Sequence, residues 1–159
     1  MQVLAVQVRD AATAVPLMIA APFLRPWHGR WGATDAELRQ SLPGDDALLS
    51  AHVRWTRAIT IGAPPKEVWP WLVQVGYDKA RFYSNDLLDR LGRPSADELC
   101  REWQNVRVGE WVAMAANPTE KTAFRVAGFE EPHRLLWKEP DSTWSWRLTP
   151  SGEGRTPAW

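Results

Sequence analysis

This sequence has little cysteine and no net charge. Its 159 residues include one cysteine, Cys100, so an intramolecular disulfide framework and a multi-cysteine zinc site are excluded. Nineteen basic residues balance nineteen acidic ones. Proteins that bind nucleic acid by neutralising phosphates usually carry a basic excess. We therefore expect no nucleic-acid partner.

Long apolar runs are also missing. The N-terminal runs Val3–Val8 and Ala11–Leu24 are separated by Arg9 and Asp10, and the second has about 14 residues where a spanning helix needs about 20. Three interpretations of this segment stay open: a packed or interfacial arm, a membrane anchor, and a secretory signal. We expect an N-terminal arm over residues 1–33 and a domain over residues 34–159. The expected location is cytoplasmic, with membrane contact through residues 1–24 as the alternative.

Sequence motifs for catalysis are absent as well. The chain has no nucleophile elbow, P-loop or Gly-x-Gly-x-x-Gly segment. His28, His52 and His133 are isolated, without a second ligand at metal-binding spacing. Cys100 lies on a predicted short helix, where an inert thiol is the simpler interpretation. We therefore expect no metal and no cofactor.

Tryptophan, by contrast, is abundant. There are 11 tryptophans against two tyrosines and four phenylalanines. Each indole buries a large area and carries one N–H that needs a partner. Two interpretations stay open: a heavily aromatic core, or an aromatic-lined pocket for an apolar ligand.

The first half of the chain predicts short helices and one strand. Thr34 begins a capping-box sequence that favours a helix to about Ser41. Residues 55–61 alternate as a strand, with Ile59 and Ile61 on its buried face. Residues 63–76 predict a helix that begins at a proline, bends at Pro70 and has Gly76 as its C′ residue. Its expected apolar stripe consists of Val68, Leu72 and Val75.

Two further short helices are predicted before residue 104. Ser84, Asn85 or Asp86 could cap a helix that bears Leu87, Leu88 and Leu91. The sequence of residues 95–98 is a second capping box, which predicts a short helix through about Trp103.

After Gly109 the apolar pattern changes to period two. Turn residues separate four predicted strands, which indicates an antiparallel meander with one aromatic face and one polar face. The order of strand, helices and then strands predicts the α+β class. The residues expected to share the aromatic faces are Trp111, Ala113, Ala115, Phe124, Val126, Leu135, Trp137, Trp144, Trp146 and Leu148.

Several segments together resemble a branch of the SRPBCC superfamily, the START-like group with polyketide cyclase/dehydrase-type and lipid-transfer proteins. The resemblance covers roughly residues 25–156, and its motifs are specific for the branch but not for one activity. It rests on Ala63–Pro65, Val68–Gly76, Phe82–Asp86, Glu102–Gln104, Val108–Glu110, Arg25–Trp27, Trp31–Asp35 and Leu42–Asp45.

The resemblance implies a helix-grip fold, in which a curved antiparallel sheet wraps around a long C-terminal helix and leaves a hydrophobic cavity. The alternation then nominates for the concave face Trp111, Phe124, Val126, Trp137, Trp144 and Trp146. Tyr83 and Asp86 could supply polar contacts to a ligand, although capping of a helix by Asp86 is the simpler role.

The end of the sequence departs from that family pattern. Family members continue after Thr156 with a last strand and the long helix, so we expect a C-terminally incomplete domain with a partly open aromatic groove. An open groove invites association. We expect the N-terminal arm or a second copy of the chain to cover it, and a truncated gene product is the alternative.

Three functions follow from these observations. The first is binding of a small hydrophobic molecule, such as a lipid, polyketide or isoprenoid. The second is a cyclase or dehydrase type of enzyme, which would need an acid or base in the cavity, with Asp86 or Glu102 as the candidates. The third is a membrane-peripheral or interaction protein that uses residues 1–24.

Overall fold

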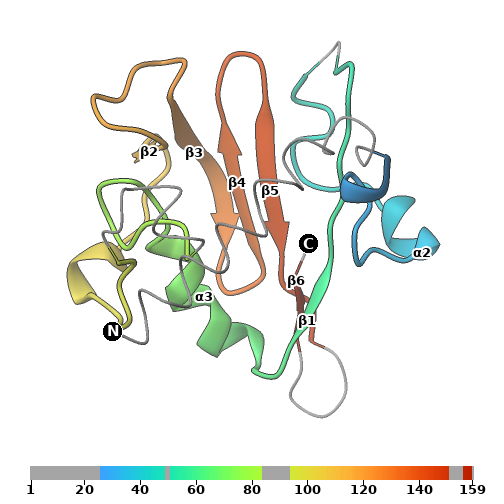
Figure 1. The fold of residues 1–159 in the computed structure, drawn as a ribbon, viewed down its shortest axis with the longest axis horizontal. Helices are drawn as coiled ribbons and strands as arrows, with labels where there is room; N and C mark the ends of the chain where they lie inside the picture. Colours follow the sequence, from blue (N-terminus) through green and yellow to red (C-terminus); the bar gives the residue numbers. More distant parts are fainter. Residues whose placement is uncertain (1–25, 49–50, 84–93, 151–155, 159) are drawn as a thin grey trace, which may run out of the picture.

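The computed structural model describes residues 26–48, 51–83, 94–150 and 156–158 (Figure 1). Short helices precede a run of antiparallel strands, which confirms the predicted α+β class. The predicted N-terminal apolar runs and the predicted helix over residues 84–91 lie outside the described residues. The division into an arm and a domain therefore stays a prediction.

Four consecutive strands form an antiparallel meander in the order β2-β3-β4-β5. Their bounds are Trp111–Ala113 for β2, Ala123–Glu130 for β3, Arg134–Lys138 for β4 and Thr143–Arg147 for β5. This confirms the antiparallel meander of at least four strands predicted from the alternating pattern. A register shift between Val126 and Gly128 leaves Ala127 unpaired, as in a β-bulge.

A separate two-stranded sheet joins the two halves of the chain. Strand β1, Ile59–Ile61, pairs antiparallel with β6, Thr156–Ala158 (Figure 1). The sequence pattern did not predict β6. A short strand therefore forms where the resemblance predicts the last strand to be missing, while the predicted C-terminal truncation stays a prediction.

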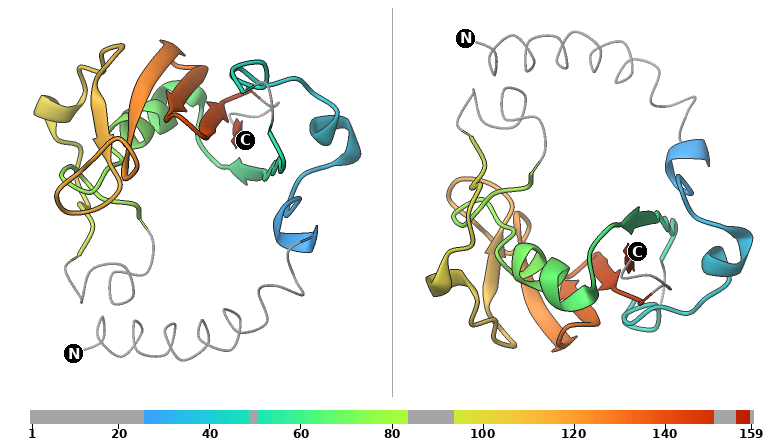
Figure 2. Two further views of the ribbon diagram at one scale, coloured as in Figure 1. Left: turned by 90° about the horizontal axis from the view of Figure 1, so that it is seen from above. Right: turned by 90° about the horizontal axis from the view of Figure 1, so that it is seen from below.

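Helix α3, Pro65–Val73, lies along one side of the four-stranded sheet (Figure 2). It begins at a proline, as predicted, because the missing N–H of Pro65 has no intrahelical partner there. Pro70 is inside the helix, where it removes one backbone hydrogen bond. The C-cap is Gln74, so Val75 is the C′ residue. Gly76, which was predicted at C′, lies one position further along the chain.

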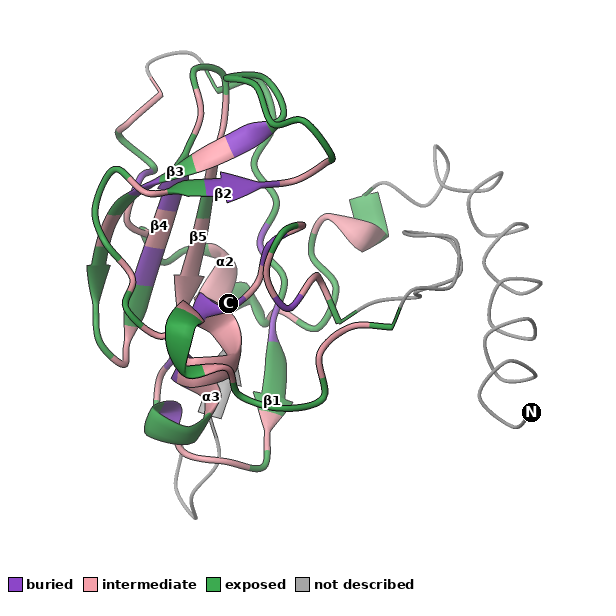
Figure 3. Ribbon diagram, turned by 90° about the vertical axis from the view of Figure 1, so that its left-hand side faces the viewer, coloured by how far each residue is buried: buried purple, intermediate pink, exposed green. Residues whose placement is uncertain are grey.

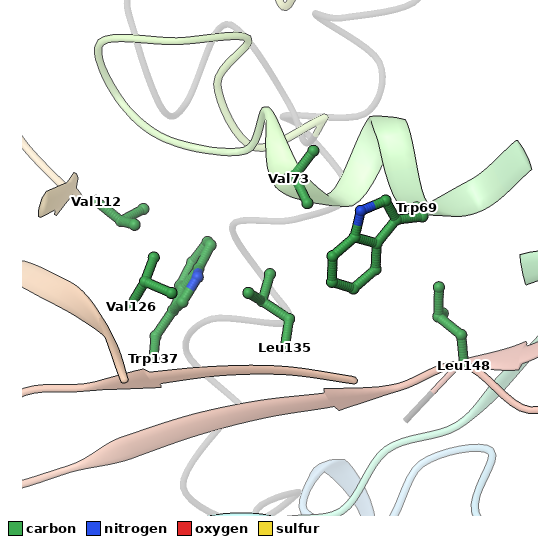
Figure 4. Packing of buried hydrophobic residues seen from close by; sticks show 7 residues of the cluster. All are labelled: Trp69, Val73, Val112, Val126, Leu135, Trp137 and Leu148. Carbon is green, nitrogen blue, oxygen red and sulfur yellow. The ribbon is translucent and has the colours of Figure 1, made fainter. Parts of the chain in front are cut away.

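The two faces of the sheet follow from the strand register. Val126 pairs with Trp137, Trp137 pairs with Trp144, and Leu135 pairs with Trp146, so these side chains share one face. We call it the helix-side face, because its buried members pack against Trp69 and Val73 of α3 (Figure 4). The opposite side is the outer face. Figure 3 shows the buried residues concentrated on the sheet strands and α3.

The row of α3 that packs most deeply differs from the predicted one. Trp69 and Val73, four residues apart, are each 3% exposed. The predicted stripe of Val68, Leu72 and Val75 is only partly buried and flanks this core. The helix is therefore rotated by about one residue, because the large indole of Trp69 takes the position over the sheet.

The outer face of β4 and β5 is covered by residues 40–47. Gly44 has a positive φ and lies against Leu136, where an added Cβ would be 2.6 Å from a methyl carbon. The Lys138 ammonium donates to the Ala47 carbonyl over 3.3 Å, and the Arg147 guanidinium donates to the Gln40 side chain over 3.1 Å. Segments almost a hundred residues apart in sequence are thereby joined.

The predicted burial in the first strand was wrong. Ile59 is 53% exposed and Ile61 is half-buried, whereas Thr56 and Ala58 are buried. The reason is that Thr56 and Ala58 donate backbone hydrogen bonds to the carbonyls of Gly29 and Trp31. Residues 29–31 therefore run along the edge of this segment, and Thr56 and Ala58 take the buried positions that the alternation predicts for Ile59 and Ile61.

The two predicted capping boxes had different outcomes. Thr34 caps α2, Asp35–Leu38, with both reciprocal hydrogen bonds to Glu37 in place, although the helix ends before Ser41. The second box forms no helix: the Cys100 N–H, which would donate to the Ala96 carbonyl in a helix, donates to the Gln74 side chain instead. Only the 3-10 turn η1, Arg101–Trp103, follows, and its N-cap Cys100 makes no side-chain capping bond.

Candidate functional site

The helix-side face carries a row of aromatic rings in mutual contact. Trp137 meets Trp146 with ring centroids 4.2 Å apart, and Trp144 stacks on Trp146 at 5.0 Å with the planes 19° apart. Phe124 contacts Trp137 at 6.3 Å and Trp144 at 6.0 Å. These contacts cross β3, β4 and β5, so the strand register itself assembles the row. We call these four residues the aromatic row.

Burial decreases along the aromatic row from β4 to β5. Trp137 is 1% exposed, Phe124 and Trp146 are half-buried, and Trp144 is 44% exposed. The buried end packs on α3, where Val126 and Leu135 complete the core. The predicted aromatic face therefore has two parts. The end at Trp137 belongs to the core, and the end at Trp144 is open to a further apolar contact.

Trp111 does not belong to this row, which corrects the predicted concave face. Its register partner is Arg125, whereas Phe124 pairs with Val112. Residues that pair directly share a face, so Trp111 lies on the outer face and Val112 takes the inner position. The Arg125 guanidinium lies 4.1 Å from the centroid of the Trp111 ring, a cation–π contact.

A shallow pocket of about 380 Å³ surrounds Trp111 on the outer face. It lies beside the bulge in β3, on the opposite side of the sheet from α3. Its lining mixes small apolar residues with charges of both signs: Gly109, Trp111, Glu120, Ala123, Arg125, Val126, Ala127, Lys138, Glu139 and Pro140.

Gln74 forms a buried polar hub that the sequence pattern did not reveal. Its side chain is fully buried and makes four hydrogen bonds. The amide nitrogen donates to the Tyr83 hydroxyl over 2.5 Å and to the Glu98 carbonyl over 3.2 Å. The amide oxygen accepts from the Cys100 N–H over 3.2 Å and from the Gln104 side chain over 3.1 Å. The sequence signal for this hub is the single polar residue, Gln74, between the apolar residues Val73 and Val75.

Tyr83 is held by this hub rather than by the aromatic row. Its ring contacts Trp71 at 5.8 Å, and its backbone has a positive φ of 52°. Partial burial raises the pKa of Tyr83 above its usual value, and the hydrogen bond from Gln74 opposes that effect. The predicted role of Tyr83 as a ligand contact stays a prediction.

Of the two candidate acid–base residues, the structure describes Glu102, which does not belong to the aromatic row. Glu102 is exposed on η1, and Asp86 lies outside the described residues. The Cys100 thiol is half-buried. His133 lies with its Nδ1 atom 3.2 Å from the Leu148 carbonyl oxygen, and His28 packs its ring on Trp27.

The described ranges contain neither a metal-binding cluster nor a membrane-spanning helix. Residues 26–48, 51–83, 94–150 and 156–158 contain no group of three His, Cys, Asp or Glu side chains placed to hold a metal ion. No helix in this part of the chain has both the length and the apolar character to cross a membrane.

The fold was compared with known proteins. No protein-family model and no curated protein sequence matches the chain, so membership of the SRPBCC superfamily stays a prediction. The crystal structure of CalU16 from Micromonospora echinospora is similar at 22% sequence identity and a TM-score of 0.36. The match covers 64% of this chain and 54% of CalU16, so it spans about half the length of that protein.

Proposed function

We propose that this protein binds a small hydrophobic molecule, of the lipid, polyketide or isoprenoid kind, at the exposed end of the aromatic row. One observation carries the proposal: Trp144 is 44% exposed although it stacks on Trp146, which contacts the buried Trp137. A continuous series of ring contacts thus connects the buried core of the sheet with a solvent-exposed indole.

The driving force is removal of the remaining indole surface from water. Each Å² of apolar surface that a ligand covers contributes about 25 cal/mol. The stacked rings of Trp144 and Trp146 are held by β5, so little side-chain entropy is lost on binding. A flat, apolar ligand fits this surface best, because it can extend the existing stack.

Orientation of the ligand comes from the indole N–H groups. Within the described residues, no hydrogen bond involves the indole nitrogens of Trp144 or Trp146. A donor without a partner favours an acceptor oxygen on the ligand. This supports a carbonyl- or hydroxyl-bearing lipid or polyketide over a pure hydrocarbon.

Native mass spectrometry of the full chain tests the proposal. Protein purified without detergent is analysed for a co-purified molecule and is then offered a panel of fatty acids, isoprenoid alcohols and aromatic polyketides. The proposal predicts one bound molecule per chain with at least one class of the panel. Absence of any retained molecule, combined with no binding across the panel, would overturn it.

A further inference from the structure

A second exposed aromatic surface is built by two segments that lie side by side. The Thr56 N–H donates to the Gly29 carbonyl over 2.9 Å, and the Ala58 N–H donates to the Trp31 carbonyl over 3.1 Å. Residues 26–33 therefore run next to residues 55–58 (Figure 1). The sequence pattern treated these segments as an arm and a strand and did not connect them.

The pairing turns large side chains of both segments toward solvent. Thr56 and Ala58 are buried, so Trp55, Arg57 and Ile59 lie on the opposite, exposed side of the extended chain. Trp27, Trp31, Trp55 and Ile59 are each more than half exposed. We call these four residues, with Arg57, the indole surface.

A chain of contacts makes the indole surface continuous. Trp27 contacts Trp31 at 6.1 Å and the His28 ring at 5.1 Å. The Arg57 side chain donates to the His28 carbonyl over 2.9 Å, and its guanidinium lies 5.5 Å from the centroid of the Trp55 ring. The rings of Trp27 and Trp55 are thus connected through Arg57.

One arginine next to these rings has no carboxylate partner in the described part of the chain. Within the described residues Arg57 makes no ion pair, whereas Arg30 and Arg54 pair with the carboxylates of Asp35 and Asp45. An unpaired guanidinium beside exposed indoles can bind a phosphate. Tryptophan prefers the boundary between lipid headgroups and acyl chains, since its ring is apolar and its N–H is polar.

We infer that the indole surface docks on an anionic lipid bilayer. Trp27, Trp31 and Trp55 would enter the interface, and Arg57 would contact headgroup phosphates. In sequence, the apolar run Ala11–Leu24 ends three residues before Trp27, which favours a bilayer over a small ligand. This inference is independent of ligand binding at the aromatic row.

Vesicle flotation with the full chain tests the inference. The vesicles contain phosphatidylcholine and phosphatidylglycerol, and pure phosphatidylcholine serves for comparison. The variant Trp27→Ser/Trp55→Ser is matched by Val108→Ser/Trp111→Ser, which removes two exposed apolar side chains at and just before β2, away from the aromatic row. We expect the first variant to partition at least about tenfold more weakly and the second to bind like the unmodified chain.

A charge variant separates loss of docking from loss of folding. Arg57→Glu leaves every indole in place and should reduce binding to the anionic vesicles far more than to the neutral ones. Equal binding by all three variants would overturn the inference, as would a lack of flotation by the unmodified chain. A dimer that disappears in Trp27→Ser/Trp55→Ser, without any lipid binding, would show that a second copy is the partner and would also overturn it.

Discussion

The indole of Trp137 meets the indole of Trp146 across β4 and β5, with ring centroids 4.2 Å apart and planes 67° apart. The Trp137 side chain is buried, whereas that of Trp144, its direct register partner, is 44% exposed to solvent. Neighbouring tryptophans of one row therefore have different roles, one in stability and one at a surface.

Removal of the enclosed indole should cost far more than removal of the open one. We expect Trp137→Ala to lower the free energy of unfolding by about 3–5 kcal/mol, because it leaves a large cavity against α3. Trp144→Ala should cost about 1 kcal/mol, the size of a lost aromatic pair. Urea unfolding followed by circular dichroism measures both values. Equal losses would contradict the division of the aromatic row into core and surface.

The Gln74 hub should be essential for stability although it is polar. Gln74→Leu would leave the part-buried Cys100 N–H and Gln104 amide without this acceptor, at a cost of about 1–3 kcal/mol. The matched control is Gln40→Leu, whose side chain accepts one exposed hydrogen bond from Arg147. That control should change the stability by less than about 0.5 kcal/mol. A comparable loss in both variants would mean that the hub has no special role.

Gly32 should tolerate no side chain. Its φ is +74°, and an added Cβ would be 2.0 Å from the Ala58 carbonyl oxygen. We expect Gly32→Ala to destabilise by at least about 1–3 kcal/mol, because both the strain and the clash must be relieved. Gly62→Ala is the control: no heavy atom is within 4 Å of its Cβ, and φ is not positive. An unchanged Gly32→Ala protein would show that residues 29–31 do not pack on residues 56–58.

Stability at high pH should depend on Tyr83. Because partial burial raises the pKa of Tyr83 in the folded chain, its phenol ionises at a lower pH in the unfolded chain. The resulting stabilisation is present below pH 10 and is lost as the pH rises through the folded value. Tyr83→Phe should therefore weaken the decrease of stability with pH above about 10. Absorbance at 295 nm in a Tyr77→Phe background follows the ionisation directly, and an unshifted titration would contradict the burial of the phenol.

Local patterns were sufficient for part of the fold. The alternation in residues 123–148 predicted three strands and their faces, because period two is decisive where one face is buried. The capping box at Thr34 also formed as predicted. In both cases the determining interactions are within a few residues of each other in sequence.

Tertiary contacts decided the rest. The face of Trp111 depends on its pairing with Arg125 across the loop between β2 and β3, and no local pattern in residues 111–113 contains that register. Ile59 is exposed because Thr56 and Ala58, which pair with residues 29–31, take the buried positions of its segment. The capping box at Ser95 did not start a helix because the N–H of Cys100 donates to the distant Gln74 side chain and not to the Ala96 carbonyl.

The most direct test of ligand binding at the aromatic row compares Trp144→Ala with Trp111→Ala in a titration with the neutral apolar probe N-phenyl-1-naphthylamine. Both variants remove one partly exposed indole, but from opposite faces of the sheet. We predict that Trp144→Ala weakens the affinity at least about tenfold, while Trp111→Ala leaves it unchanged. Loss of affinity in Trp111→Ala alone would place the ligand in the outer-face pocket and contradict the proposed site.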